Sequence, residues 1–369
     1  MPDTRLAGLI GFCLSPMLAL PALAEEQPAP VSIELQHRPG EEVSVNLSGD
    51  AGAKDRAVRA DMPVRIASIS KLVTALGVMR LVDQGRLDLD RDVGDYLGWP
   101  VRNPHFPDRA VTLRMLLSHT ASLSDAAGYY LPLDGRLQDL VADSEAWHQD
   151  HAPGSGFFDY ANLGSPIIAA VMEKATGQRY DAIMQQQVFT PLALTACFNW
   201  SNCPTGQRDQ AITLLRPDGS LAKDPLLAPG EEECALVATK DGSCDLRHYV
   251  LGENGSSFSP QGGLRISAKE LLVVGKLLVR DDMAFLSPAA WQAMRQTQWR
   301  ADGLVSAGAA QQWALGLEVQ PGGWIGHSGN AYGLRAGLWA NRLIGEVRVR
   351  IVTMVDEAVP EGPCLHSCP

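Results

Sequence analysis

Lysine is scarce in this chain of 369 residues: only seven of its 31 basic side chains are lysine. Basic charge is also in deficit, and the formal net charge of −11 argues against nucleic acid or an anionic membrane surface as the main partner. No Cys-x-x-Cys pair is present, so the usual zinc-binding spacing is missing. Because 46% of the residues are hydrophobic and 20% are charged, the chain can build a large core and is not disordered by composition.

Long apolar runs are also absent after the first 24 residues. Arg5 precedes an apolar stretch over 6–23 that ends in Ala22-Leu23-Ala24, a pattern typical of a cleaved export signal. A retained transmembrane helix is the alternative, but Pro16 and Pro21 interrupt the stretch. We therefore expect a signal peptide over 1–24, a periplasmic or secreted protein over 25–369, and no stable membrane anchor.

Cysteine use fits an oxidising compartment, because an even number, six, follows the expected signal. Cys13 lies inside the signal without the small-residue context of a lipoprotein cysteine. Six cysteines allow 15 connectivities. The three nearest-neighbour pairs are favoured because each lies in a stretch rich in Gly, Pro or Asn: Cys197–Cys203, Cys234–Cys244 and Cys364–Cys368.

Hydrophobic periodicity predicts strands at both ends of the chain and helices between them. Such an order favours an α/β (α+β) fold, with a sheet part over about 25–67 and 260–369 and a mostly helical insertion over about 68–259. A looped region, 195–262, precedes a helix that opens with a capping box, Ser267 with Glu270. The predicted strands are 31–35, 43–47, 336–340 and 347–352, and the predicted helices are 68–84, 112–117, 137–147, 164–175, 180–189 and 267–279.

The first candidate for chemistry is Ser68-Ile69-Ser70-Lys71. A serine and a lysine three residues apart share one helix face, where the amine can deprotonate the hydroxyl. Ser68 opens an apolar helix, whose N-terminal N–H groups favour an anionic nucleophile. A second match, Ser220 to Lys223, follows Pro217-Asp218-Gly219 and is expected in a surface turn.

Two further short motifs follow in the chain. Tyr160-Ala161-Asn162 is expected on a loop before a helix; a phenol can relay a proton and an amide can hold both a lysine and a substrate carbonyl. A packed core tyrosine is the alternative. His327-Ser328-Gly329 is expected at the start of a strand, where glycine lets a ligand approach the backbone closely.

Taken in this order, the motifs resemble the serine β-lactamase and penicillin-binding-protein superfamily, in the branch of class C β-lactamases, D,D-carboxypeptidases, D-aminopeptidases and related esterases. The resemblance covers most of the chain after the signal. It implies an antiparallel sheet flanked by helices, with no cofactor and a small-molecule or cell-wall peptide substrate. The stretches that carry it, besides the motifs, are 65–72, 81–90, 116–120 and 262–267.

By this resemblance Ser68 would be the acylated nucleophile, while Lys71 and Tyr160 would share the acid and base roles. Asn162 would position Lys71 and the substrate carbonyl. The N–H groups of Ser68 and Asn330, the latter on the strand expected to begin at His327, would form the oxyanion hole. His119 is expected to be a structural residue near the site.

The chain departs from the family pattern in two places. His327 stands where class C β-lactamases carry lysine, a pattern that favours carboxypeptidase- or esterase-like activity, because an unperturbed histidine is mostly neutral at pH 7. Arg335 is a candidate replacement cation, with a solvated strand residue as the alternative. Relatives end in a helix packed on the sheet, whereas 356–369 is short and contains Pro360 and Pro363, so another element must cover that face.

The sequence offers three alternatives to this function: an α/β-hydrolase, a metallohydrolase and a binding or sensor protein. Gly326 to Asn330 nearly matches the G-x-S-x-G motif of α/β-hydrolases but ends in asparagine, with no suitable Asp and His after it. His148-Gln149-Asp150-His151 is an incomplete metallohydrolase pattern. A binding or sensor protein on the same fold, non-catalytic or slow to deacylate, stays open, as do the substrate and the oligomeric state.

Overall fold

The structure is a computed structural model that describes residues 27–53, 55–227, 234, 236–302 and 311–356. The expected signal, 1–24, and the Cys364–Cys368 pair lie outside the described residues. Among the described residues, no helix is long and apolar enough to cross a membrane.

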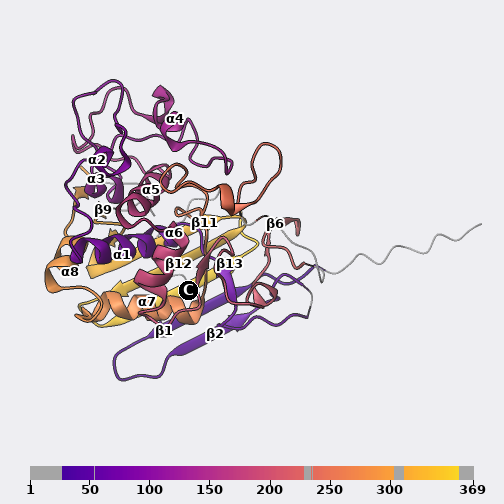
Figure 1. Ribbon diagram of the computed structural model, residues 1–369. Helices are drawn as coiled ribbons and strands as arrows, with labels where there is room; N and C mark the ends of the chain where they lie inside the picture. The colour runs from indigo at the N-terminus through magenta and orange to yellow at the C-terminus, as the bar shows by residue number, and fades with distance from the viewer. Residues whose placement is uncertain (1–26, 54, 228–233, 235, 303–310, 357–369) are drawn as a thin grey trace, which may run out of the picture.

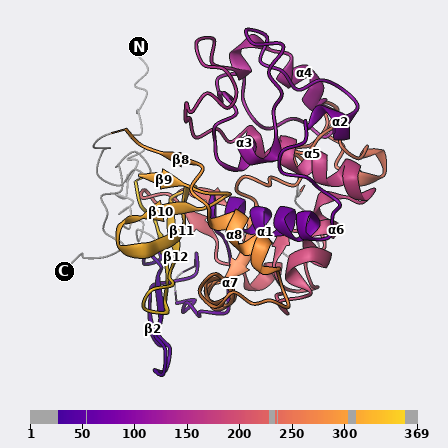
Figure 2. The same ribbon diagram turned by 90° about the vertical axis from the view of Figure 1, so that its left-hand side faces the viewer.

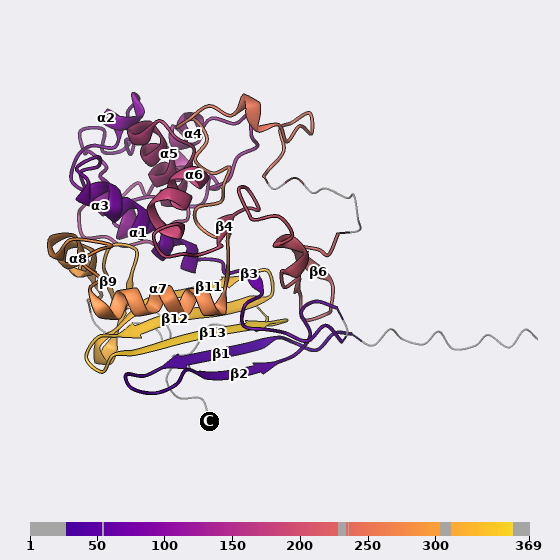
Figure 3. The ribbon, with the colours of Figure 1, turned by 60° about the horizontal axis from the view of Figure 1, so that its bottom comes forward.

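A sheet of eight strands forms one layer of the molecule (Figures 1 and 3). All of its neighbouring strands are antiparallel, and the two ends of the described chain meet where β1 pairs with β13. This confirms the expected antiparallel sheet. In spatial order the strands are β2 (Ser44–Ser48), β1 (Ser32–His37), β13 (Glu346–Thr353), β12 (Leu334–Asn341), β11 (Trp324–Ala331), β10 (Glu318–Gln320), β9 (Gln312–Trp313) and β8 (Trp299–Arg300).

The two faces of this sheet differ because side chains alternate along each strand. On β13, Val347, Val349 and Ile351 are buried against helix α7 (Ala268–Arg280), which lies along the sheet in Figure 3. The opposite face is mixed: Arg350 pairs with Glu34 at 3.1 Å, and the buried side chains of Trp324 and Trp339 lie on the same face. The sequence predicts another element over this face, and the described residues do not test that prediction.

Helices lie on the other side of α7 from the sheet (Figures 2 and 3). The central one is α1 (Ile69–Asp83), which is buried along almost its whole length and contacts β11 and β12 of the sheet as well as the helices above it. The Ser267–Glu270 capping box is present at the start of α7. The remaining helices are α2 (Gly94–Leu97), α3 (Leu113–Leu117), α4 (Leu137–Val141), α5 (Gly164–Thr176), α6 (Tyr180–Met184) and α8 (Pro288–Arg295).

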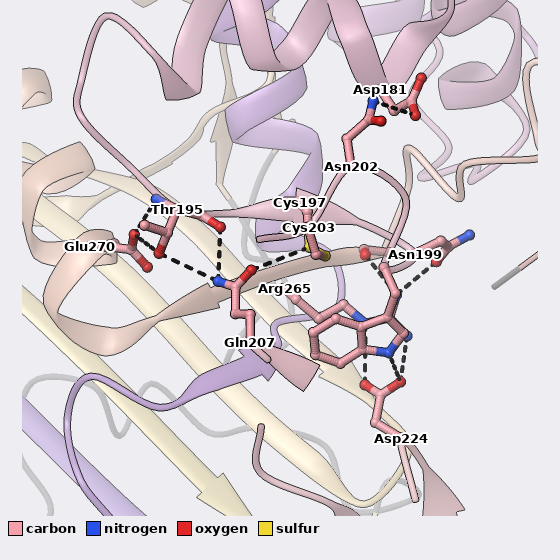
Figure 4. The surroundings of a disulfide bond; sticks show 12 residues. Asp181, Thr195, Cys197, Asn199, Asn202, Cys203, Gln207, Asp224, Arg265 and Glu270 are labelled. Carbon is pink, nitrogen blue, oxygen red and sulfur yellow. Dashed lines mark hydrogen bonds and ion pairs between the residues drawn. A yellow bond between two sulfur atoms is a disulfide. The ribbon is translucent and has the colours of Figure 1, made fainter. Parts of the chain in front are cut away.

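A second, three-stranded sheet leads into α1. Its strands lie in the order β3 (Pro63–Arg65), β7 (Leu264–Ser267) and β4 (Cys197–Phe198). The Cys197–Cys203 disulfide joins β4 to the loop behind it (Figure 4), and Cys234–Cys244 closes a second loop. Both bridges are pairs that the sequence favoured. A hairpin of β5 (Leu214–Leu215) and β6 (Leu221–Lys223) lies in the region expected to be loop.

Most predicted elements agree with the structure within one or two residues at each end, and three differ more. The helix expected over 137–147 is divided into α4 and a 3-10 turn, Ser144–Ala146. The helix expected over 180–189 becomes a π-helical turn after Met184, because Gln185–Phe189 widens before Pro191 ends the helix. The strand expected to begin at His327 begins at Trp324, since the apolar Trp324 and Ile325 extend its pairing with β10.

Candidate active site

Ser68 lies at a sharp turn between β3 and α1. Ala67, directly before it, has a positive φ of 48°, a conformation that costs a residue other than glycine about 1–3 kcal/mol. Strand β11 packs tightly on this turn, because a Cβ on Gly329 would lie 2.3 Å from the carbonyl oxygen of Ile66. The turn leaves Ser68 half-exposed at the N-terminus of a buried helix.

Lys71 lies one turn into α1 and is only 5% exposed. Its Nζ donates to Ser68 Oγ at 3.1 Å, to Asn162 Oδ1 at 2.8 Å and to the Gln261 carbonyl at 3.1 Å. Burial lowers the pKa of Lys71 to about 7, although the carboxylates of Asp125 and Glu318 act in the opposite direction. An amine with this pKa, in contact with a serine hydroxyl, can serve as a base at neutral pH.

Tyr160 is held in a cluster of aromatic side chains beside Lys71. The Lys71 ammonium lies 4.7 Å from the centre of the Tyr160 ring, and the His119 ring is tilted against the same phenol at 4.4 Å. Burial raises the pKa of Tyr160, an effect that the neighbouring Ser68 hydroxyl partly offsets. The phenol oxygen is enclosed and has no hydrogen-bond partner among the described residues. The Tyr160 phenol is therefore neutral, and it lies beside Ser68 without a core hydrogen-bond partner among the described residues.

His119, expected to be structural, agrees with that role. It has a positive φ of 57°, is buried, and contacts the Trp313 ring at 4.9 Å. Burial and the nearby charge of Lys71 hold its pKa well below the usual value, so it stays neutral.

Asn162 is oriented by Asp125, a residue that the sequence analysis missed. Asp125 accepts from the side-chain amide of Asn162 at 2.8 Å and from the backbone N–H groups of Asn162 and Leu163 at 2.9 and 3.0 Å. These bonds turn the carbonyl oxygen of Asn162 toward Lys71. Asp125 lies seven residues after Ser118, and no short motif marks it.

His327 lies on β11, on the inner face of the sheet, and is 1% exposed. Its Nδ1 lies 2.6 Å from the Ser328 carbonyl, which makes Nδ1 the donor and leaves Nε2 as an acceptor. Nε2 is enclosed and has no partner among the described residues. Burial and Lys71 lower the pKa of His327 to about 3, so this position carries no positive charge at neutral pH.

Glu318, on β10, is a second residue that the sequence analysis missed. It accepts from the Ser328 N–H at 2.9 Å and from the Ser328 hydroxyl at 2.7 Å. Burial raises its pKa. The Ser328 N–H points to the edge of β11 that faces away from β12. N–H groups two residues apart on a strand point to the same edge, so the Asn330 N–H points there too, toward α1.

Arg335 lies on the other face of the sheet from His327. Arg335 lies on β12, opposite Asn330 of β11, and its Nη2 donates to the Asp356 carbonyl at 2.7 Å. It therefore does not take the place of a cation at His327.

The remaining sequence candidates lie apart from this cluster. Ser220 lies in a turn, as expected, and its backbone N–H donates to the side chain of Asp218 at 2.9 Å. His148 bonds Asp159 at 2.6 Å, and His151 stacks on Phe157 at 3.7 Å. The described part of the chain holds no group of three or more side chains that could bind a metal ion.

Comparison with known proteins gives one family. A family model described as Beta-lactamase matches residues 37–361. Penicillin-binding protein 4 of Amycolatopsis lactamdurans is 34% identical over 171 residues, which are 43% of this chain and 44% of the relative. Esterase EstB of Burkholderia gladioli is 34% identical over 164 residues, 38% of this chain and 40% of the relative. Each match thus spans less than half of the curated relative.

Solved structures share the fold over nearly the whole chain. The octameric penicillin-binding protein homologue from Pyrococcus abyssi has a TM-score of 0.66 at 20% identity, covering 90% of this chain and 71% of its own. The D-amino acid amidase from Ochrobactrum anthropi SV3 has a TM-score of 0.61 at 20% identity, covering 88% and 86%.

Proposed function

Because this chain belongs to the Beta-lactamase family, we propose that it is an exported serine hydrolase that cleaves an amide or ester through an acyl-enzyme on Ser68. The observation that carries the proposal is the 3.1 Å contact between Ser68 Oγ and the Nζ of Lys71, whose pKa of about 7 leaves much of the amine neutral at pH 7. In this proposal the sheet part, 25–67 and 260–369, and the helical part, 68–259, are the two sides of the site.

The proposed first step is attack by Ser68 on the substrate carbonyl. Neutral Lys71 takes the hydroxyl proton as the new C–O bond forms, and Asn162, fixed by Asp125, holds the amine in place. The N–H groups of Ser68 and Asn330 stabilise the negative charge on the carbonyl oxygen.

Collapse of the tetrahedral intermediate breaks the bond to the leaving group. Tyr160, a neutral phenol with an unpartnered hydroxyl, gives the leaving group its proton and recovers one from Lys71. Water then attacks the acyl-enzyme with the same residues as base and acid, and Ser68 is released.

For substrates, we propose small esters and peptides of D-amino acids ahead of β-lactams. The His327-Ser328-Gly329 sequence supports this order, because it resembles the carboxypeptidase and esterase members rather than the class C β-lactamases, which carry lysine in place of the histidine. The related esterase and the D-amino acid amidase of similar fold fit the same classes.

The test compares short-chain 4-nitrophenyl esters, nitrocefin and a peptide ending in D-Ala-D-Ala. We expect turnover of an ester or the peptide by the wild type and a loss of at least about a thousandfold in Ser68→Ala. Ser220→Ala is the matched control, since Ser220 heads the other Ser-x-x-Lys sequence, and should keep wild-type rates. Equal activity in Ser68→Ala would refute the proposal, and acylation without release would identify a binding protein instead.

A further inference from the structure

A cavity of about 280 Å³ adjoins the Ser68–Lys71 pair on the side of Gln261. The backbone carbonyl of Gln261 accepts from Lys71 Nζ, while its side chain lines the cavity and its Oε1 has no partner among the described residues. Tyr160 and His327 do not line this cavity. The cavity therefore lies on the Gln261 side of Lys71, and Gln261 connects it to the Ser68–Lys71 pair.

Among the described residues that line this cavity, cationic side chains outnumber carboxylates. Arg65, Lys223 and Arg265 line it together with one described carboxylate, that of Asp224. Asp224 is fully engaged by one of them: Arg265 donates to it from Nε at 3.2 Å and from Nη2 at 2.5 Å (Figure 4). Arg265 Nη1 also donates to Asn199, on the loop that the Cys197–Cys203 disulfide closes (Figure 4).

Arg65 is the cavity arginine that makes no ion pair with any described residue, although the charge of Asp224 lies close enough to raise its pKa. It is 4% exposed, and within the described part of the chain its guanidinium makes one hydrogen bond, from Nε to the Gly262 carbonyl at 3.0 Å, and no ion pair. The guanidinium also lies 4.6 Å from the centre of the Tyr332 ring. None of its nitrogens is among the enclosed atoms without a partner, so the two Nη groups face the cavity.

Arg65 keeps its positive charge in this environment. Burial, with the neighbouring Arg265, lowers its pKa only to about 10. Two Nη groups in a rigid plane match the two oxygens of a carboxylate, and a charge-assisted pair of this kind is stronger than a neutral hydrogen bond. Lys223, half-exposed at the end of β6, adds a second positive charge at the cavity wall.

We propose that this cavity binds a carboxylate carried by the acyl group of the substrate, with Arg65 as the bidentate partner and Lys223 beside it. The inference rests on the proposed function, because it assigns the acyl part to the Gln261 side. The leaving group departs toward Tyr160, which donates its proton from the other side of Lys71. The expected substrates are esters or amides of dicarboxylic or carboxylate-bearing acids, with an acyl chain short enough for 280 Å³.

The test uses two esters of equal chain length, 4-nitrophenyl hydrogen glutarate and 4-nitrophenyl valerate, which differ by a terminal carboxylate in place of a methyl group. We expect the wild type to have the higher kcat/KM for the glutarate ester by at least about tenfold. This ratio should fall at least about tenfold in Arg65→Gln and less in Lys223→Gln. Arg59→Gln, an exposed arginine away from the cavity, is the control for net charge and should keep the wild-type ratio.

A wild-type preference for valerate, or a ratio unchanged in both cavity variants, overturns the inference and leaves the proposed function standing. If Arg65→Gln does not fold, the half-exposed Lys223→Gln decides the matter alone. If neither ester is cleaved, turnover of the D-Ala-D-Ala peptide decides the proposed function. Equilibrium binding then tests the inference separately: tighter binding of glutarate than of valerate, weakened by Lys223→Gln, supports it, and equal binding of the two acids refutes it.

Discussion

Lys71 is the residue on which the proposed chemistry depends, and its environment explains its role. Three acceptors surround the amine, but none is a carboxylate, so burial is not balanced by an ion pair. The low pKa that results is what allows an amine to act as a base near pH 7.

The first prediction concerns pH. Lys71 is active as a base only when neutral, so kcat/KM should rise about tenfold per pH unit below pH 7 and level off above it. The kcat/KM of Lys71→Arg should be at least about a thousandfold lower than that of the wild type, because arginine stays protonated. A wild-type profile that is flat from pH 5 to pH 8 would rule out Lys71 as the base.

Asp125 acts on Lys71 through Asn162 and through its charge. Asp125→Asn removes a negative charge that raises the pKa of Lys71, so the rising limb of the pH profile should move to lower pH. It also loosens Asn162, and we expect kcat to fall by about ten- to a hundredfold. Asp139→Asn, an exposed acid on α4, is the control. An unshifted pH limb would leave Asp125 with a purely structural role.

At the scale of elements, Glu173 ties α5 to the loop over 249–254. Its buried carboxylate accepts from the N–H groups of Tyr180 at 2.9 Å and Gly252 at 2.7 Å, and from the Tyr249 hydroxyl at 2.8 Å. Burial raises its pKa to about 7. The loop continues in sequence toward Gln261 at the site. Glu173 therefore fixes the loop that leads to one side of the site without contacting the site itself.

Glu173→Gln should destabilise the protein by about 1–3 kcal/mol, because an amide has one acceptor oxygen and places an NH₂ group against buried donors. Denaturant unfolding at pH 7 measures this change. Glu253→Gln, exposed in the same loop, should change the free energy of unfolding by less than about 0.5 kcal/mol. Equal stability of the two variants would contradict the role assigned to Glu173.

Elements with strong local patterns could be predicted from the sequence, and elements defined by tertiary contacts could not. The apolar spacing of α1 and the capping box of α7 mark their starts within one residue. Strands β8 to β10 are two or three residues long and are ordered by pairing with one another and, through β10, with β11, so no period in the sequence identifies them.

The same distinction applies to the site. Ser68, Lys71, Tyr160 and Asn162 were found because their types and spacings form short motifs. Asp125 and Glu318 were missed because each acts on a motif residue from a distant segment, a relation that exists only in the fold.

At the scale of the whole molecule, two short disulfide-closed loops lie in the part of the chain that runs from β4 to β7. The Cys197–Cys203 and Cys234–Cys244 bridges have sequence separations of 6 and 10 residues. Closing a loop of this size lowers the conformational entropy of the unfolded chain, which raises the free energy of unfolding by about 2–3 kcal/mol per bridge.

Reduction should therefore lower the free energy of unfolding by about 2–3 kcal/mol per bridge, measured with and without a reductant in denaturant titrations. The double variant Cys197→Ser/Cys203→Ser should reproduce one part of this loss and also alter the cavity that Asn199 lines. The variant Cys234→Ser/Cys244→Ser separates the two bridges. No effect of reductant on unfolding would show that the bridges do not contribute to stability.

The central claim is that Ser68 is acylated during turnover, and mass spectrometry of the quenched intact protein tests it most directly. With a short-chain 4-nitrophenyl ester in excess, we expect the mass of one acyl group to appear within the first turnover, to map to the peptide that contains Ser68, and to decay when substrate is exhausted. Ser68→Ala should show no adduct and no turnover. Sustained hydrolysis by Ser68→Ala, or an adduct on a different residue, would contradict the mechanism.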